Sequence, residues 1–250
     1  MRRLGSTEIA AVSALFEPKL ALELPKSKTA GDVWLRLVAG IDMPKRKPMQ
    51  RGLDMEPWAL AYYAEHFGPW WREKPLGEWW TIAHPNFEWA TASPDAYDSP
   101  EARRVIEIKT QSEWARKQWG MPGTDEMATR YLYQCAWLMA CSGAAETHVL
   151  CVFGNDTPDD GFVVTEPAAY RVERDESLET SLLVMGERFW SEFVLTGQPP
   201  PVRPAANRRE MKRVLHERGV DVKEWERRCD ERGEVEEQSG DEAGGGDGGD

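Results

Sequence analysis

The stretch Val105-Ile106-Glu107-Ile108-Lys109 predicts a buried β-strand that carries two charged side chains on one face. Successive side chains of a strand point to opposite sides of the sheet, so Glu107 and Lys109 share a face with Val105, and the two isoleucines line the other face. The Cα atoms of Glu107 and Lys109 would lie about 7 Å apart, which is twice the rise of one strand residue. Charged groups in an apolar strand are costly unless they are paired or bound to a metal ion.

A further acidic residue lies upstream of this strand, in Ser93-Pro94-Asp95. Two carboxylates and a lysine that converge could hold a divalent cation and a water molecule beside a phosphodiester. The alternative is purely structural: Glu107 and Lys109 would form a salt bridge on an edge strand with one solvated face. Both interpretations fit the spacing of the residues.

Periodicity and turn residues predict a mixed order of helices and strands along the chain. This order predicts an α/β fold with a central mixed β-sheet flanked by helices. We expect one domain over residues 1–204, a charged helical extension over 205–232 and a disordered, acidic, Gly-rich tail over 233–250. The expected helices are 6–15, 31–39, 53–67, 125–141 and 177–196, and the expected strands are 78–89, 103–110, 147–153, 162–165 and 170–173.

The composition indicates a globular protein of the cytoplasm. Of the 250 residues, 41% are hydrophobic, but they form no apolar run of the roughly 18 residues that a membrane span needs. The N-terminus lacks the apolar core of a signal peptide. The four cysteines show no C-x-x-C spacing, which favours reduced, buried thiols.

The charge of the chain argues at first against a nucleic-acid partner. The net charge is −12, and residues 231–250 account for −7 of it, with eight acids and one arginine, which leaves −5 elsewhere. A basic cluster occurs at Lys45-Arg46-Lys47 and Arg51. A metal site concentrates carboxylates that a bound cation offsets, so the acidity does not exclude a DNA-binding protein.

An ordered set of short motifs runs through the chain, over about residues 3–200. Together the motifs resemble the YqaJ-like viral recombinase family, which is also the family of the phage lambda exonuclease, within the PD-(D/E)XK nuclease superfamily. They are Thr7-Glu8-Ile9-Ala10, Asp32-Val33-Trp34, Arg51-Gly52 with Glu56, His84-Pro85, Ser93-Pro94-Asp95, Glu107-Ile108-Lys109, Tyr131 with Gln134, Tyr170, Phe189-Trp190 and Gly197.

The resemblance implies a restriction-endonuclease-like PD-(D/E)XK core and a role for each matching residue. Asp95 and Glu107 would bind the metal ion, with the backbone carbonyl of Ile108 as a further ligand. Lys109 would position the attacking water, and two more residues, Gln134 and Glu56, would border and support the metal centre. The positions that the resemblance and the basic cluster place near DNA are Thr7, Arg3, Arg51 and Ser93.

Two departures from the family pattern concern the turn at Asp95 and the N-terminus. Ala96 follows Asp95 where the family usually has Gly. The arginine that binds a 5′ phosphate in the lambda-type enzyme has no counterpart at the same distance before Thr7, and Arg2 or Arg3 would have to substitute for it.

The function that the resemblance implies is a Mg²⁺-dependent DNA exonuclease of the phage recombination type, in which Mn²⁺ would substitute for Mg²⁺. It would resect linear duplex DNA from its ends, in the 5′ to 3′ direction, for a single-strand annealing protein. We expect a homo-oligomeric ring, such as a trimer, in the bacterial host cytoplasm. The alternatives are an endonuclease or repair-complex nuclease of the same fold, and a non-enzymatic DNA-binding or assembly module.

Overall fold

The computed structural model describes residues 2–24, 27–78, 80–101, 103–157, 159 and 161–244. The chain divides into two compact units. Unit 1 comprises Met1–Pro44 and Thr180–Asp250, and unit 2 comprises Lys45–Glu179. Unit 1 therefore combines both ends of the chain, and the expected extension over 205–232 belongs to the same unit as the N-terminal helices.

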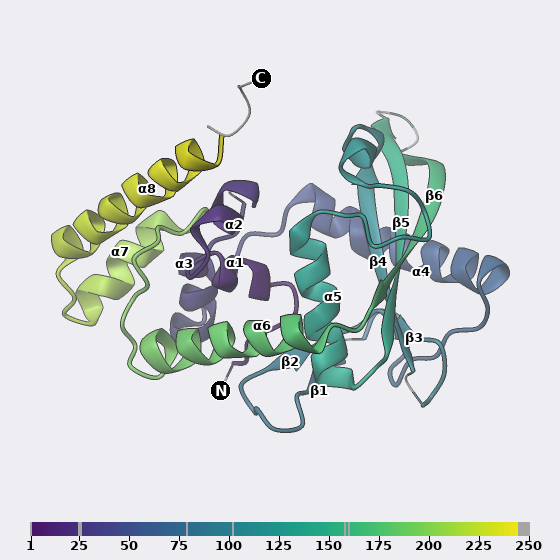
Figure 1. Ribbon diagram of the computed structural model, residues 1–250, viewed down its shortest axis with the longest axis horizontal. Coiled ribbons are helices and arrows are strands. Elements are labelled where there is room, and N and C mark those ends of the chain that lie inside the picture. Colours follow the sequence, from purple (N-terminus) through teal and green to yellow (C-terminus); the bar gives the residue numbers. More distant parts are fainter. Residues whose placement is uncertain are drawn as a thin grey trace, which may run out of the picture. The chain divides into compact units, whose positions relative to one another are not determined.

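Unit 2 is built on a four-stranded mixed sheet (Figure 1). Its spatial order is β3-β4-β5-β6, in which β4 runs parallel to β5 and both outer pairs are antiparallel. The strands are β3 (Ala96–Tyr97), β4 (Arg104–Ser112), β5 (Glu146–Thr157) and β6 (Gly161–Glu173). The expected α/β class with a central mixed sheet is confirmed.

Helices α4 (Lys47–His66) and α5 (Thr129–Ser142) pack against this sheet. The apolar side of β4 faces α4, where Ile106 joins a buried cluster that includes Leu60 and Tyr63. The opposite side of β4 faces α5, because Glu107 accepts a hydrogen bond from Gln134 of that helix. The alternation expected from the sequence of β4 is therefore present.

The boundaries of three elements in unit 2 differ from the expected ones. α4 begins at Lys47 and not at the expected residue 53, because Pro48 is tolerated in the first turn of a helix. Where one or two strands are expected over 78–89, the described residues form the short β1 (Ile82–Ala83), which pairs with β2 (Thr91–Ala92). The strands expected at 162–165 and 170–173 are one strand, β6, which accommodates Pro167 because β6 is the outermost strand.

Unit 1 is helical. Its helices are α1 (Ile9–Ser13), α2 (Pro18–Glu23), α3 (Ala30–Trp34), which continues as a π-helical turn over Leu35–Ala39, α7 (Arg208–Glu217) and α8 (Val222–Gly244). α6 (Glu176–Phe189), followed by a second π-helical turn over Trp190–Val194, begins in unit 2 and continues into unit 1. The α3 segment ends at Gly40, whose φ of +73° suits glycine, as the sequence predicts.

Helix α8 continues into the segment for which disorder is expected. It extends through Gly244, and residues 245–250 lie outside the described residues. Arg227 pairs with Glu224 and Glu231 at helical spacing, and such pairs stabilise a helix surface. Glu and Gln, which follow in the sequence, also have high helix propensity, so composition alone was a poor guide to this segment.

All four cysteines (Cys135, Cys141, Cys151 and Cys229) are buried and free, as expected from their spacing. Within the described residues, no helix is both long enough and apolar enough to cross a lipid bilayer.

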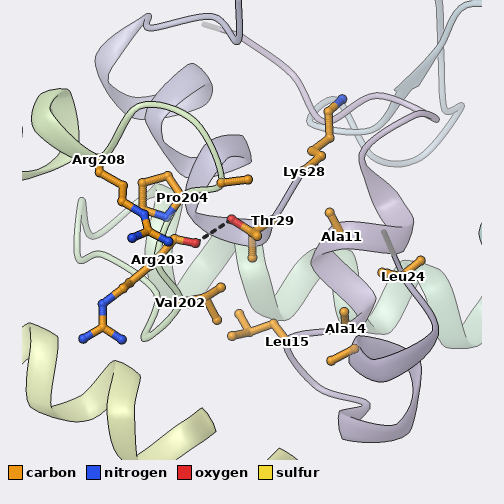
Figure 2. Close-up of a pocket in the computed structure, with 13 residues that line it drawn as sticks. Ala11, Ala14, Leu15, Leu24, Lys28, Thr29, Val202, Arg203, Pro204 and Arg208 are labelled. Carbon is orange, nitrogen blue, oxygen red and sulfur yellow. Dashed lines mark hydrogen bonds between the residues drawn. The ribbon is translucent and has the colours of Figure 1, made fainter. Parts of the chain in front are cut away.

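Unit 1 holds a cavity of about 240 Å³ between α1, α2, α3 and the segment around Pro204 (Figure 2). Thr29 caps α3, and its hydroxyl donates to the carbonyl oxygen of Arg203 at 2.9 Å. Asp32 is 2% exposed and accepts from the backbone amides of Thr29 at 2.9 Å and of Ala205 at 2.8 Å. These bonds draw the 203–206 segment onto the start of α3.

Gly31 makes this close approach possible, and its replacement is expected to destabilise unit 1. A Cβ atom at Gly31 would lie 2.4 Å from the carbonyl oxygen of Val202, whereas a Cβ at Gly52 in α4 would meet nothing within 4 Å. Gly31→Ala should therefore lower the free energy of unfolding by about 1–3 kcal/mol. Gly52→Ala, as the matched control, should raise it by about 0.5–1 kcal/mol. Thermal unfolding of both variants checks this, and equal midpoints would contradict it.

His148 in β5 is expected to make stability depend on pH. Burial, together with the charge of Arg104, lowers the pKa of His148 from 6.5 to about 4, and its Nδ1 lies 2.9 Å from the Tyr63 hydroxyl. Between these two pKa values the unfolded chain binds a proton that the folded chain does not, so stability falls as the pH falls through this window. The free energy of unfolding, measured with urea at several pH values, should fall more steeply for the wild type than for His148→Gln. The difference in slope should be at most about 1.4 kcal/mol per pH unit, and identical slopes would refute the assignment.

Candidate active site

The cluster around Glu107 is formed by β4 and α5. Glu107 is 4% exposed and Gln134 is 6% exposed, so both polar side chains are enclosed in the core. Gln134 begins the run of residues on α5 that are buried through Cys141. Because β4 directs alternate side chains toward α5, Glu107 and Lys109 meet Gln134 on the same side of the sheet.

Three hydrogen bonds close this cluster. The ammonium of Lys109 donates to Glu107 Oε1 and, at 2.9 Å, to Gln134 Oε1. The amide nitrogen of Gln134 donates to Glu107 Oε1 at 2.7 Å. The second carboxylate oxygen of Glu107, Oε2, is buried and has no hydrogen-bond partner in the described part of the chain. Glu107 is therefore fixed by one oxygen and keeps the other for a further ligand.

Asp95 lies next to this cluster, at the start of β3. The register pairs Ala96 with Ile106, and one residue further in the same register Asp95 lies opposite Glu107. Asp95 Oδ2 accepts the backbone N–H of Ile108 at 2.6 Å. The structure thus brings together Asp95, Glu107 and Lys109, with Gln134 hydrogen-bonded to Glu107 and Lys109.

The charges in this cluster perturb each other. Burial and the negative charge of Glu107 raise the pKa of Asp95 well above its ordinary value, although Lys109 and the Ile108 amide oppose the shift. Burial acts against the charge of Lys109, but Glu107 and Asp95 together raise the pKa of Lys109. One lysine therefore faces two carboxylates, and the site has a surplus of negative charge.

The donors fit a divalent cation such as Mg²⁺. The unpartnered oxygen of Glu107 and the carboxylate of Asp95 are hard oxygen ligands, which Mg²⁺ prefers together with water. Within the described residues, no three His, Cys, Asp or Glu side chains are grouped so that they could hold a metal ion. A cation at this place would thus rest on two carboxylates, water and the carbonyl oxygen of Ile108 that the resemblance implies.

Glu56 and Ser93 lie beside Asp95. All three residues line a cavity of about 100 Å³, together with Arg72 and Trp80. Glu56 forms an ion pair with Arg72, and the hydroxyl of Ser93 lies 3.1 Å from that of Thr81. The structure therefore places Glu56 and Ser93 beside Asp95, and the contact of Ser93 with DNA stays a prediction.

The other residues expected to contact DNA are not among the residues that line this cavity. Arg51 forms a 2.9 Å ion pair with Asp156 of β5, and its guanidinium lies 4.7 Å from the ring centre of Phe162. Arg3 and Thr7 are exposed and belong to unit 1. Their contacts with DNA stay predictions.

Arg72 and Trp80 line the cavity and were not among the site residues expected from the sequence. The side chain of Arg72 is 8% exposed and pairs with an acid sixteen positions away. A signal was nevertheless present: the helix neighbours of Glu56 at three and four residues are Gly52, Leu53, Ala59 and Leu60, none of which is basic. A half-buried glutamate in α4 thus needed a cation from another segment.

The chain was compared with known families and solved structures. A family model described as the YqaJ-like viral recombinase domain matches residues 2–145. The chain belongs to this family. No curated protein sequence matches the chain.

Three solved structures share the fold. An alkaline exonuclease (LHK-Exo) from Laribacter hongkongensis is 22% identical with a TM-score of 0.54, and the match covers 78% of this chain and 89% of that chain. The same exonuclease in complex with dAMP is 21% identical with a TM-score of 0.55, over 87% and 93% of the two chains. A phage-related exonuclease from Haemophilus somnus 129PT is 12% identical with a TM-score of 0.55, over 78% and 96%.

The family and the fold expected from the sequence are therefore confirmed. The mixed sheet with its flanking helices is the PD-(D/E)XK type of core that the resemblance implied. The family match and these exonuclease folds together support the expected class, a metal-dependent nuclease of the recombination type.

Asp95→Asn is expected to separate metal binding from folding. The substitution removes a buried negative charge next to Glu107 and can keep the acceptor for the Ile108 amide. The variant should unfold at the same temperature as the wild type, or a higher one, in EDTA. Mg²⁺ or Mn²⁺ should raise the midpoint of the wild type but not that of the variant.

The control for this experiment is Asp156→Asn, which removes an exposed acid paired with Arg51. It should keep the full metal-induced rise in the midpoint. A rise of equal size in Asp95→Asn would show that Asp95 does not bind the metal ion.

Proposed function

We propose that this protein is a divalent-metal-dependent deoxyribonuclease that hydrolyses duplex DNA from its ends. The observation that carries the proposal is the arrangement of Glu107, which is held through one oxygen by Lys109 and Gln134 and offers the other beside Asp95. A structural salt bridge would not require the added amide of Gln134, nor a second, repelling carboxylate. Membership in the YqaJ-like family supports the same conclusion.

Each residue of the cluster has a defined task in this proposal. When bound, Mg²⁺ would supply an activated water and offset the charge of the phosphate. Asp95 and Glu107 hold that ion, and Gln134 keeps Glu107 in the required rotamer. Lys109 has three N–H donors, of which Glu107 and Gln134 take two, so the third can hold the attacking water or a phosphate oxygen. In a site with little water, such a fixed cation stabilises the charge that develops in the transition state.

The finer parts of the proposal rest on the family resemblance. We include digestion in the 5′ to 3′ direction, Mn²⁺ in place of Mg²⁺, and delivery of the exposed single strand to an annealing protein. A ring-shaped homo-oligomer would keep the enzyme on its DNA. The alkaline exonucleases of the same fold make DNA ends the first substrate to examine.

Lys109→Ala is expected to abolish digestion. Because it leaves the buried charge of Glu107 without its cation, it should also lower the stability, so the rate is measured on variant protein that circular dichroism shows to be folded. With Mg²⁺, the wild type should degrade end-labelled linear duplex and spare covalently closed circles. The variant should lose at least about 100-fold in rate, the usual effect of removing one donor that stabilises a transition state. The exposed Lys117, replaced by alanine, is the matched control and should retain the wild-type rate.

Three outcomes would change the proposal. Retained digestion by Lys109→Ala would remove the role assigned to this residue. Nicking of closed circles by the wild type would indicate an endonuclease. Absence of metal-dependent cleavage of any DNA would favour a binding or assembly module.

A further inference from the structure

Arg72 is fixed in position relative to Asp95 by its neighbour in the chain. The backbone amide of Trp71 donates to the carbonyl oxygen of Tyr97 at 2.8 Å, and the amide of Tyr97 donates back to Trp71 at 2.9 Å. The rings of Trp71, Tyr97 and Trp80 pack against one another, with centroids 5.3 to 6.4 Å apart. Because Tyr97 follows Asp95 by two residues, this bridge places Arg72 beside the carboxylate.

Arg72 and its neighbour Trp80 have more hydrogen-bond donors than the described residues have acceptors for them. One terminal nitrogen of Arg72 pairs with Glu56, and the other donates to the carbonyl oxygen of Glu78 at 3.3 Å. The Nε of Arg72 and the indole nitrogen of Trp80 are both buried and have no partner among the described residues. A buried donor without an acceptor loses its hydrogen bonds to water and gains none in return, so it destabilises the fold. Two such donors beside the same small cavity therefore indicate that a bound ligand supplies the acceptor.

The chemistry of the cavity defines the class of that acceptor. The cavity has a volume of about 100 Å³, and its polar lining consists of Arg72, Trp80 and Ser93 together with the acids Glu56, Glu78 and Asp95. A space of this size can hold a group as small as a phosphate. A guanidinium binds phosphate oxygens in a planar, charge-assisted manner that suits this task.

We infer that Arg72 and Trp80 form a subsite for one phosphate of the DNA strand, adjacent to the phosphate that is cleaved. Arg72 supplies the charge, and the Trp80 indole supplies a second, neutral donor. Asp95, which belongs to both the subsite and the metal site, sets the two phosphates next to each other. The inference rests on the proposed nuclease function and assigns a strand contact to residues outside the metal cluster.

A purely structural role for Arg72 makes different predictions. If Arg72 served only to neutralise Glu56, then replacing both residues would remove the need for either one. If Arg72 binds a phosphate, the double variant Arg72→Gln/Glu56→Gln would still lack the contact. The test therefore has to report on a single phosphate and not on overall activity.

The experiment uses short duplexes in which one linkage near an end is an uncharged methylphosphonate. The full-length protein is assayed with Mg²⁺ under single-turnover conditions, with the modification moved one linkage at a time. The measured quantity is the cleavage rate on the unmodified duplex divided by the rate on the modified duplex. For the wild type, this ratio should be about 10-fold or more at one linkage next to the cleaved bond, which is the effect of losing one charged hydrogen bond.

The variants decide the assignment. In Arg72→Gln and in the double variant, the ratio at that linkage should fall to about one. The matched control is Arg104→Gln, which also removes an ion-paired arginine of unit 2 but leaves Glu146 paired with Arg171. It should show the wild-type ratio at every linkage. Arg72→Lys keeps the charge beside Glu56 but lacks the Nε donor. Its ratio should therefore lie between that of the wild type and that of Arg72→Gln, and this variant replaces Arg72→Gln if the latter does not fold.

The failures are distinguishable. If Arg72→Gln or the double variant shows the wild-type ratio, the subsite is refuted and the nuclease function is unaffected. If Arg72→Gln does not fold, a wild-type ratio in Arg72→Lys has the same meaning. Absence of any metal-dependent cleavage by the wild type would overturn the proposed function, and the subsite with it.

Discussion

The buried ion pair between Glu107 and Lys109 is the constraint on which this site depends. A carboxylate that is 4% exposed is stable only if its charge is offset, and Lys109 lies two residues further along the same face of β4. Gln134 completes the arrangement and thereby fixes which side of α5 faces the sheet. Breaking a buried pair by removing one partner typically costs about 3–5 kcal/mol. The candidate catalytic groups are therefore part of the core of unit 2, and their geometry follows from its packing.

The parts that could be predicted from the sequence are those that depend on neighbouring residues. The alternation in β4 fixed the faces of Glu107 and Ile106, because a strand has a period of two. The glycines that end α5 and the α3 segment, Gly143 and Gly40, adopt positive φ, which other residues rarely do. Local sequence patterns do not predict that Asp95 and Gln134 lie near β4, because no such pattern connects a turn, a strand and a later helix. That prediction came from the family resemblance.

The parts that could not be predicted depend on contacts between distant segments. The Arg72–Glu56 pair forms because a bridge between Trp71 and Tyr97 carries Arg72 to α4. The continuity of β6 through Pro167 depends on its place at the edge of the sheet, which the sequence of the strand does not state. Unit 1 likewise joins residues from both ends of the chain, through bonds such as those from Ala205 and Ala206 to Asp32.

The local balance of charge reconciles an acidic chain with a polyanionic substrate. The net charge of −12 suggests repulsion of DNA, but, apart from the exposed Glu78 at the rim, the site holds three carboxylates, on Glu56, Asp95 and Glu107, and two cations, on Arg72 and Lys109. That sum is −1, and one divalent ion would change it to +1. The uncompensated carboxylate would thus repel the DNA phosphate until a metal ion binds, so DNA binding would require the metal ion. Screening by salt weakens the effect of the remote acids, while the buried pairs act at close range. Attraction and catalysis would then depend on the same ion, held by the two residues that repel each other without it.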